Sequence, residues 1–205
     1  MAVAKFVCTA LIAIAFTARP PIVAADVQAG PASEFMRAVS DDAIRILRSA
    51  DLTKEERDAR FRALLEERFD MPFIARFALG RYWQTATMQQ REAYTRTFTE
   101  YVLQVYSARL RDYTRETLRV ISERQAGERD VVVDTRIERP SREPLEAQWR
   151  VRDVDGRLRI IDVVLAGISM VITQRDEFAA ILQRQNVDGL ISAMRVRAEE
   201  MRKQG

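Results

Sequence analysis

The sequence contains no histidine, and its single cysteine, Cys8, lies within the first 25 residues. The rest of the chain therefore has no imidazole base, no thiol nucleophile, no disulfide and no histidine or cysteine metal ligands. These absences exclude most hydrolase mechanisms and predict that the chain holds no metal. Paired carboxylates would still permit acid–base chemistry without histidine.

Long apolar runs are also scarce. The one clear run spans residues 6–16, follows Lys5, and has Thr9 as its only polar residue. Small residues at Val23 and Ala25 then suit a cleavage point, and the run is too short for a membrane anchor. We predict a signal peptide over residues 1–25, cleaved near Ala25, and one domain over residues 26–205. A retained N-terminal anchor is the alternative.

Charge of one sign is not in excess. The chain has 33 Lys+Arg and 30 Asp+Glu, and loss of Lys5 and Arg19 with the signal peptide leaves a nearly neutral protein. The remaining charges are interleaved along the chain, whereas nucleic-acid binding requires a concentrated basic patch. The charge pattern therefore predicts no nucleic-acid partner.

The first half of the chain is typical of helices. Apolar residues recur at helical spacing, and Thr53 and Thr87 each begin the four-residue pattern of a capping box. Pro72 suits the first turn of a short helix, and Gly80 suits its end. We predict helices over about residues 31–50, 54–69, 72–80 and 88–113.

The second half changes to a period of two. Residues 145–152 alternate between apolar and polar side chains, which predicts a strand with one buried and one wet face. Asp155-Gly156 is a strong signal for a hairpin turn. We predict strands over about residues 117–124, 131–137, 145–152 and 157–165, a proline-bounded loop over 140–144, and closing helices over about 168–185 and 187–201.

This order of elements predicts an α+β fold, in which N-terminal helices and two C-terminal helices pack on a four-stranded antiparallel sheet. The chain has more apolar surface than one half-buried sheet needs, above all in residues 73–83. Three interpretations stay open for this surplus. It forms part of an ordinary core, it lines a cavity for a hydrophobic ligand, or it forms a groove for a partner protein.

Two polar residues near the end of the last predicted strand are candidates for chemistry. Asp162 lies among apolar strand residues, and Ser169 lies at a strand-to-helix junction. We interpret Asp162 as a structural hydrogen-bond acceptor rather than a general base. Ser169 lacks the context of a nucleophile elbow and any histidine to activate it, so we interpret it as a helix cap.

Two long blocks resemble the MlaC and toluene-tolerance family of periplasmic carrier proteins. The first is "ALGRYWQTATMQQREAYTRTFTEYVLQVY" at residues 78–106, and the second is "GISMVITQRDEFAAILQRQNVDGLISAM" at residues 167–194. Between them, the predicted last two strands match in the same order. The block "RFDMPFIARFALGRYW" at residues 68–83 is also similar to relatives linked to hopanoid synthesis.

The resemblance implies a fold in which the helices and a curved sheet enclose an apolar cavity. It implies a monomeric periplasmic carrier, not an enzyme, that binds phospholipid or a related lipid such as a hopanoid as cargo, with no cofactor. The expected partners are an outer-membrane lipoprotein–porin complex and an inner-membrane ABC transporter complex. The alternatives are an enzyme or an interaction module on a similar helix-and-sheet cone.

The resemblance also selects the residues expected to line a lipid cavity. They come from the predicted helices around residues 72–83 and 88–113, from three strands and from the junction that follows. The residues are Phe73, Phe77, Leu79, Tyr82, Trp83, Phe98, Tyr101, Val102, Val105, Tyr106, Val131, Val133, Leu145, Ala147, Trp149, Ile160, Val163, Leu165, Ile168 and Met170.

Overall fold

The structure is a computed structural model and describes residues 30–110, 115–140 and 142–204. The predicted signal peptide lies outside the described residues, so cleavage near Ala25 stays a prediction. Within the described residues, no helix is both long and apolar enough to span a bilayer.

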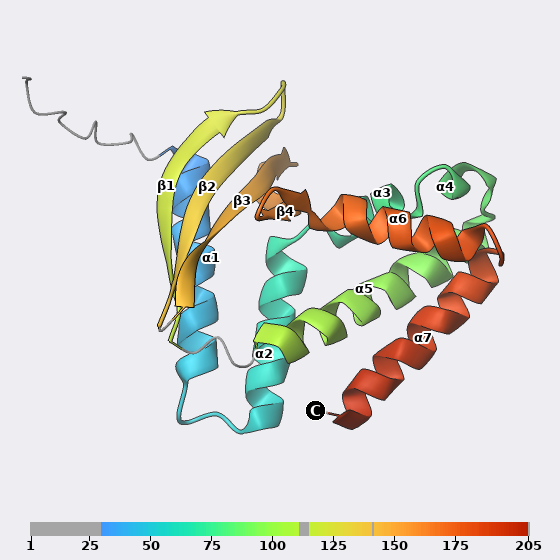
Figure 1. The fold of residues 1–205 in the computed structure, drawn as a ribbon, viewed down its shortest axis with the longest axis horizontal. Coiled ribbons are helices and arrows are strands. Elements are labelled where there is room, and N and C mark those ends of the chain that lie inside the picture. The colour runs from blue at the N-terminus through green and yellow to red at the C-terminus, as the bar shows by residue number, and fades with distance from the viewer. Residues whose placement is uncertain (1–29, 111–114, 141, 205) are drawn as a thin grey trace, which may run out of the picture.

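The predicted order of helices, antiparallel strands and further helices is confirmed (Figure 1). The N-terminal helices are α1 (Pro31–Arg48), α2 (Lys54–Arg68), α3 (Met71–Leu79), α4 (Tyr82–Thr85) and α5 (Met88–Leu110). The strands are β1 (Thr117–Gln125), β2 (Asp130–Arg139), β3 (Arg142–Val154), β4 (Arg157–Leu165) and β5 (Ile168–Ser169). The chain ends in α6 (Met170–Leu182) and α7 (Val187–Gln204).

The helix boundaries follow from capping chemistry. At the start of α2, the Thr53 hydroxyl accepts from the Glu56 N–H at 3.2 Å, and the Glu56 carboxylate accepts from the Thr53 N–H at 2.9 Å. Thr87 makes the same reciprocal pair with Gln90 before α5. Helix α3 ends at Gly80, whose φ of +58° strains any residue that carries a Cβ.

The strands form one curved sheet in the order β1-β2-β3-β4-β5, with every neighbouring pair antiparallel (Figure 1). Asp155 and Gly156 both have positive φ and close the predicted hairpin between β3 and β4. Val133 pairs with Trp149, and Trp149 pairs with Val163, so these three residues form a row across the inner face of the sheet.

The number of strands is a correction, because the sheet has five strands rather than four. Ala166 and Gly167 both have positive φ and turn the chain back, so that Ile168 pairs with Leu165. The next helix therefore begins at Met170 instead of about residue 168. A two-residue strand is too short to show an alternating pattern, which is why the sequence did not reveal it.

The predicted loop over residues 140–144 is also too long, because β3 begins at Arg142. Pro144, which has no N–H for a sheet ladder, lies in the irregularity between the pairs Arg139–Arg142 and Ile137–Leu145. The strand therefore tolerates this proline at its start.

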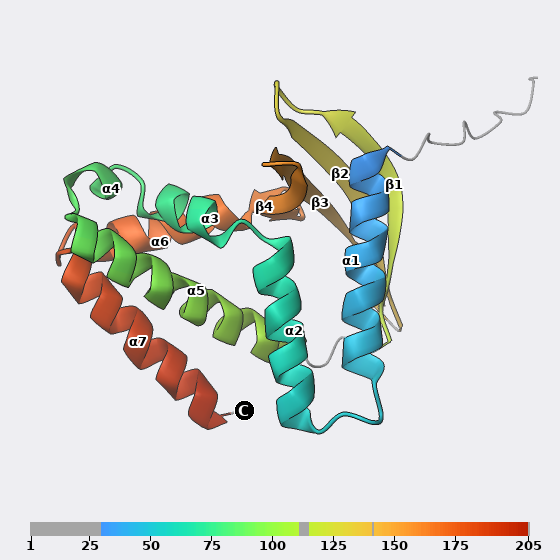
Figure 2. The same ribbon diagram turned by 180° about the vertical axis from the view of Figure 1, so that it is seen from behind.

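Among the described residues, the apolar interior has three buried clusters, of which the smallest joins α1 and α2 at Leu47, Phe61 and Leu64. In the first core, Ala32, Met36 and Val39 of α1 pack on the inner face of the sheet, at residues that include Val133 and Ile160. The second core joins α3, α5, α6 and α7 around the rings of Tyr94, Phe98 and Phe178. Figures 1 and 2 show α1 beside the strands, α5 and α7 on the far side, and α2 between them.

A carboxylate from the sheet fixes the N-terminus of α1. This helix has no side-chain cap of its own, and the Ser33 N–H in its first turn donates to Glu123 Oε2 of β1 at 2.6 Å. A negative charge at this position also complements the helix dipole. A Cβ on Gly30 would overlap Glu123 Oε1, so glycine leaves the space that this contact needs.

We expect Glu123→Ala to lower the free energy of unfolding by about 1–2 kcal/mol, because it removes a charged cap from α1. Gly30→Ala should cause a similar loss by displacing the same carboxylate. Urea denaturation followed by circular dichroism measures both effects. Glu128→Ala in the exposed β1–β2 turn is the control and should change stability little. If Glu123→Ala and Gly30→Ala were as stable as the control Glu128→Ala, this role of Glu123 would be contradicted.

Candidate functional site

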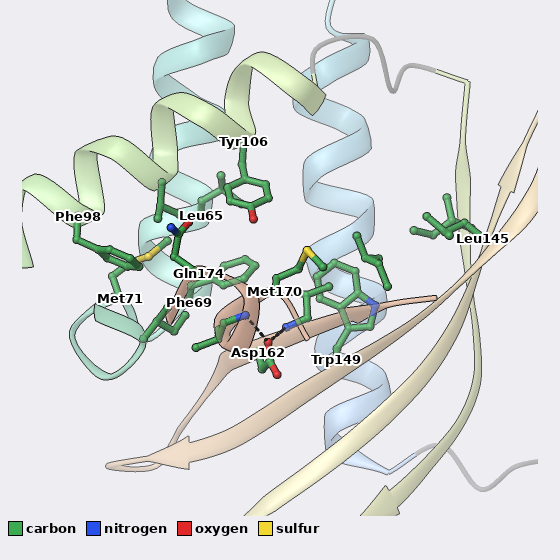
Figure 3. A pocket seen from close by; sticks show the side chains of 16 residues that line it. Leu65, Phe69, Met71, Phe98, Tyr106, Leu145, Trp149, Asp162, Met170 and Gln174 are labelled. Atoms are coloured by element: carbon green, nitrogen blue, oxygen red, sulfur yellow. Dashed lines mark hydrogen bonds between the residues drawn. The ribbon is translucent and has the colours of Figure 1, made fainter. Parts of the chain in front are cut away.

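A cavity of about 200 Å³ lies between the sheet and the helices. Its walls come from seven elements, which are the helices α2, α3, α5 and α6 and the strands β2, β3 and β4. Figure 3 shows the side chains converging on this space. The lining residues are Leu65, Phe69, Met71, Ile74, Phe98, Val102, Tyr106, Ile137, Leu145, Trp149, Asp162, Val163, Leu165, Met170, Val171 and Gln174.

The lining is almost entirely apolar and contains no lysine or arginine. The polar edge of Trp149 is turned into the sheet, where its indole N–H donates to Thr135 Oγ1 at 2.9 Å. Thr135 in turn donates to the Ala147 carbonyl oxygen at 3.1 Å. The indole therefore presents hydrocarbon to the cavity with its N–H already bonded, as buried tryptophans require.

Asp162 is the only carboxylate in the lining, and it is fully engaged in structure (Figure 3). Its oxygens accept from the Val163 N–H at 2.8 Å, the Val171 N–H at 3.2 Å and the Ser169 hydroxyl at 2.6 Å. Ser169 also caps α6 by accepting from the Ile172 N–H at 3.1 Å. Both structural interpretations, the acceptor Asp162 and the cap Ser169, are confirmed.

Few polar groups line this site. Among the residues that the structure describes, no group of three or more acidic, histidine or cysteine side chains stands close enough to hold a metal ion. The arrangement suits the enclosure of hydrocarbon, because the Asp162 carboxylate accepts from three donors and the Trp149 indole N–H is bonded within the sheet.

Eight of the predicted residues line the cavity, from α5, the sheet and the start of α6. They are Phe98, Val102, Tyr106, Leu145, Trp149, Val163, Leu165 and Met170. On α5 the first three follow each other at intervals of four, so one stripe of the helix faces the space. Their contact with a lipid stays a prediction.

Other predicted residues lie in the two cores rather than in the lining. Val131, Val133 and Ile160 belong to the core beneath α1. Leu79 and Tyr101 belong to the helical core. Ala147 and Val105 are buried without lining the cavity, whereas Ile168 is 58% exposed.

The aromatic residues of the segment 73–83 lie outside the lining as well. Phe73, Phe77, Tyr82 and Trp83 each have an arginine guanidinium over the ring. The other side of α3, through Met71 and Ile74, lines the cavity instead. The segment is apolar around most of its circumference, so helical periodicity did not distinguish its two sides.

The sequence did not assign eight lining residues to the cavity: Leu65, Phe69, Met71, Ile74, Ile137, Asp162, Val171 and Gln174. Leu65 and Phe69 stand four residues apart, which is the spacing of one helix face, and Ile137 shares the inner face of β2 with Val133. Periodicity therefore gave the correct side for these three residues. The periodicity of apolar residues did not indicate that these side chains face a cavity instead of a filled core.

Arg152, which covers the ring of Phe73 at 4.4 Å, also holds a buried carboxylate. Asp130 accepts from Arg152 Nε at 2.6 Å and from Arg150 Nε at 2.7 Å. Burial raises the pKa of Asp130, but the hydrogen bonds and charges of Arg152 and Arg150 outweigh it and hold the pKa below its ordinary value of 3.8. This ion pair links β2 and β3 to α3.

Because the folded-state pKa of Asp130 is depressed, its stabilisation is present above pH 3.8 and is lost as the pH falls through the folded value. We expect Asp130→Asn to lower the free energy of unfolding by about 3 kcal/mol at pH 7. The variant should also lose less of its free energy of unfolding than the wild type when the pH falls from 7 to 3. Urea denaturation at pH 7 and near pH 3 measures this. The control is Glu146→Gln, which breaks an exposed pair with Arg136 and should cost less than about 1 kcal/mol. If Asp130→Asn lost as much stability as the wild type between pH 7 and pH 3, this role of Asp130 would be contradicted.

Comparison with known proteins gives three findings. The model of the MlaC protein family matches residues 37–196 of this chain. The intermembrane phospholipid transport system binding protein MlaC of Haemophilus influenzae is 29% identical over 127 residues, which cover 60% of this chain and 59% of that protein. The match therefore spans about three fifths of that relative.

A solved structure has a similar fold. The phospholipid-binding protein from Ralstonia solanacearum, in complex with a phospholipid, superposes with a TM-score of 0.71 at 22% identity. The match covers 82% of this chain and 97% of that chain. At this level of identity the likeness shows a shared fold alone. The shared fold extends over nearly the whole of the neighbouring structure.

Proposed function

Since this chain belongs to the MlaC family, we propose that it is a periplasmic lipid carrier that encloses the acyl chains of a phospholipid in its cavity. The observation that carries this proposal is the lining of 16 residues, of which only Asp162 is charged. Both the relative and the structural neighbour are named for phospholipid binding or transport.

The energetics favour a deep cavity for such cargo. Each methylene group kept from water contributes about 0.8 kcal/mol, so a lipid with roughly 30 methylenes requires shielding of order 20 kcal/mol. The chain has an apolar space of about 200 Å³, below the roughly 300–1,000 Å³ typical of small-molecule pockets. In this proposal loading widens the space between the sheet and the helices, at which Phe69 packs against both cores.

The head group remains at the solvent in this proposal. No cation lines the cavity, so a phosphate that entered it would lose its hydration without gaining a partner. Recognition then rests on hydrocarbon, which phospholipids and hopanoids both present. Asp162 already has three donors, so the proposal assigns no catalytic role to the chain.

We further propose that the chain is exported, loses residues 1–25, and acts as a monomer between two membrane complexes. These are an outer-membrane lipoprotein–porin complex and an inner-membrane ABC transporter complex, in keeping with the transport system for which the Haemophilus influenzae relative is named. N-terminal sequencing of the exported protein tests the cleavage near Ala25.

Filling the cavity tests the carrier proposal directly. We expect Val102→Trp to reduce the amount of co-purified lipid at least about fivefold, because the indole occupies space that acyl chains need. Native mass spectrometry and lipid extraction of the periplasmic protein measure the cargo and identify it. Circular dichroism melting reports whether the variant is folded.

The matched control is Val196→Trp on α7, where the side chain is 59% exposed. It adds the same group outside the cavity and should keep the wild-type amount of lipid. If Val102→Trp is unstable, Leu145→Trp fills the other end of the lining from the sheet. Folded filling variants with full cargo would refute the proposal, as would wild-type protein free of lipid.

A further inference from the structure

The outer side of α3 and the turn after it carry a row of arginines stacked on aromatic rings. The distances from guanidinium carbon to ring centre are 4.4 Å for Arg152 over Phe73 and 5.2 Å for Arg175 over Phe77. They are 5.1 Å for Arg81 over Tyr82 and 5.4 Å for Arg91 over Trp83. We name these four pairs the arginine–aromatic row.

Two of these arginines come from distant parts of the sequence. Arg152 lies on β3, and Arg175 lies on α6, where its methylene stem runs beside Gly80. A Cβ built on Gly80 would meet Arg175 Cδ at 3.4 Å. The packing of α6 against α3 therefore assembles the Phe77–Arg175 pair, in which α3 supplies the ring and α6 supplies the cation.

Acidic residues are missing from this part of the chain. Residues 71–91 contain three arginines and no aspartate or glutamate, although the whole chain has 30 acidic residues. Arg76 and Arg81 are exposed, and within the described residues neither has a carboxylate at ion-pair distance. Arg175 has Asp176 at 3.8 Å, and both side chains are solvent-exposed. The segment 71–91 therefore carries accessible positive charge, while the exposed acidic residues of this surface, Asp176 and Glu177, lie on α6.

Apolar side chains protrude beside these cations. Met88, the first residue of α5, is 76% exposed, Ile172 on α6 is 45% exposed, and Phe77 is 37% exposed. Figures 1 and 2 show α3, α4 and the start of α5 gathered at the end of the molecule away from β1. Cations, half-buried rings and protruding aliphatic groups thus share one end of the fold.

We propose that this end docks on an anionic bilayer surface, with Arg76, Arg81 and Arg175 contacting lipid phosphates. Aromatic rings and arginines are the residues of the membrane interface, where the rings lie at head-group depth. Arginine forms paired hydrogen bonds with phosphate oxygens. Each cation near an anionic membrane strengthens binding about fivefold at low salt.

An acidic protein is the other class of partner that this surface fits, and the shape of the row favours the bilayer. Hot spots of protein interfaces are aromatic anchors that project into a pocket of the partner. Here each ring of the row has a guanidinium group over one face, so the partner meets cations together with partly exposed rings. Binding to a layer of lipid head groups requires positive charge and a shallow apolar contact. It does not require a pocket of matching shape.

The docking surface and the cavity are opposite sides of the same helices. Met71 and Ile74 of α3 line the cavity, as do Met170 and Gln174 of α6, while Phe77 and Arg175 face outward. A bilayer docked on this surface is therefore separated from the cavity by α3 and α6. This inference does not rest on the proposed cargo, because surface adsorption and lipid content are measured separately.

Vesicle sedimentation tests the proposal. The mature protein is mixed with vesicles of phosphatidylcholine alone or with phosphatidylglycerol at three parts in ten, in low salt. We expect binding only to the anionic vesicles, weakened at high salt as screening increases. The triple variant Arg76→Gln, Arg81→Gln, Arg175→Gln should bind about 100-fold more weakly.

The control removes the same charge elsewhere. Arg37→Gln, Arg60→Gln, Arg195→Gln changes exposed arginines of α1, α2 and α7 and should keep nearly full binding. If the first triple variant melts at a lower temperature, Arg76→Gln with Arg81→Gln alone should still weaken binding about 25-fold.

Three results would overturn the proposal. They are equal wild-type binding to neutral and anionic vesicles, an equal loss in the control triple variant, and retention on immobilised polyglutamate without any binding to vesicles. The last result would assign the surface to an acidic protein. Lipid content measured on the same samples keeps this outcome distinct from failure of the carrier proposal.

Discussion

The architecture depends on the incomplete cover that α1 gives to the apolar face of the sheet. Met36 and Val39 pack on one part of that face, and Trp149 and Val163 border both this core and the cavity. Leu145 and Leu165 continue the apolar face beyond these residues. They line the cavity and lie outside the core that α1 forms with the sheet. The helices that oppose this region are held to one another by the rings of the second core, so a space remains between the two layers.

Asp162 joins these layers and explains how an apolar site tolerates a carboxylate. The residue belongs to β4, yet two of its three donors come from Ser169 and Val171 at the start of α6. A carboxylate at a helix N-terminus is stabilised by the N–H groups and by the helix dipole. The same contact sets the direction in which α6 leaves the sheet, and so determines where Met170 and Gln174 meet the cavity.

Local patterns in the sequence predicted most of the fold, whereas the family resemblance selected half of the residues that line the cavity. Capping at Thr53 and Thr87, alternation in β3 and the turn at Asp155 each depend on neighbouring residues, so they could be read without a structure. The aromatic segment could not be assigned to a side in this way. Phe73 and Phe77 are covered by Arg152 and Arg175, which lie about 80 to 100 positions further along the chain. Such pairing depends on tertiary packing, which no periodicity encodes.

The short connection between α2 and α3 has a consequence for the sheet as a whole. Phe69 bridges to Ile160 in parallel, and the Asp70 N–H donates to the Ile160 carbonyl oxygen at 3.0 Å. Together with β5, this connection occupies the outer edge of β4, so in the described part of the chain β1 provides the open edge. Unpaired strand edges template the growth of aggregates. The fold thus closes one edge of the sheet and leaves the other to β1, whose Arg119 and Arg124 are charged residues of the kind that oppose edge-to-edge pairing.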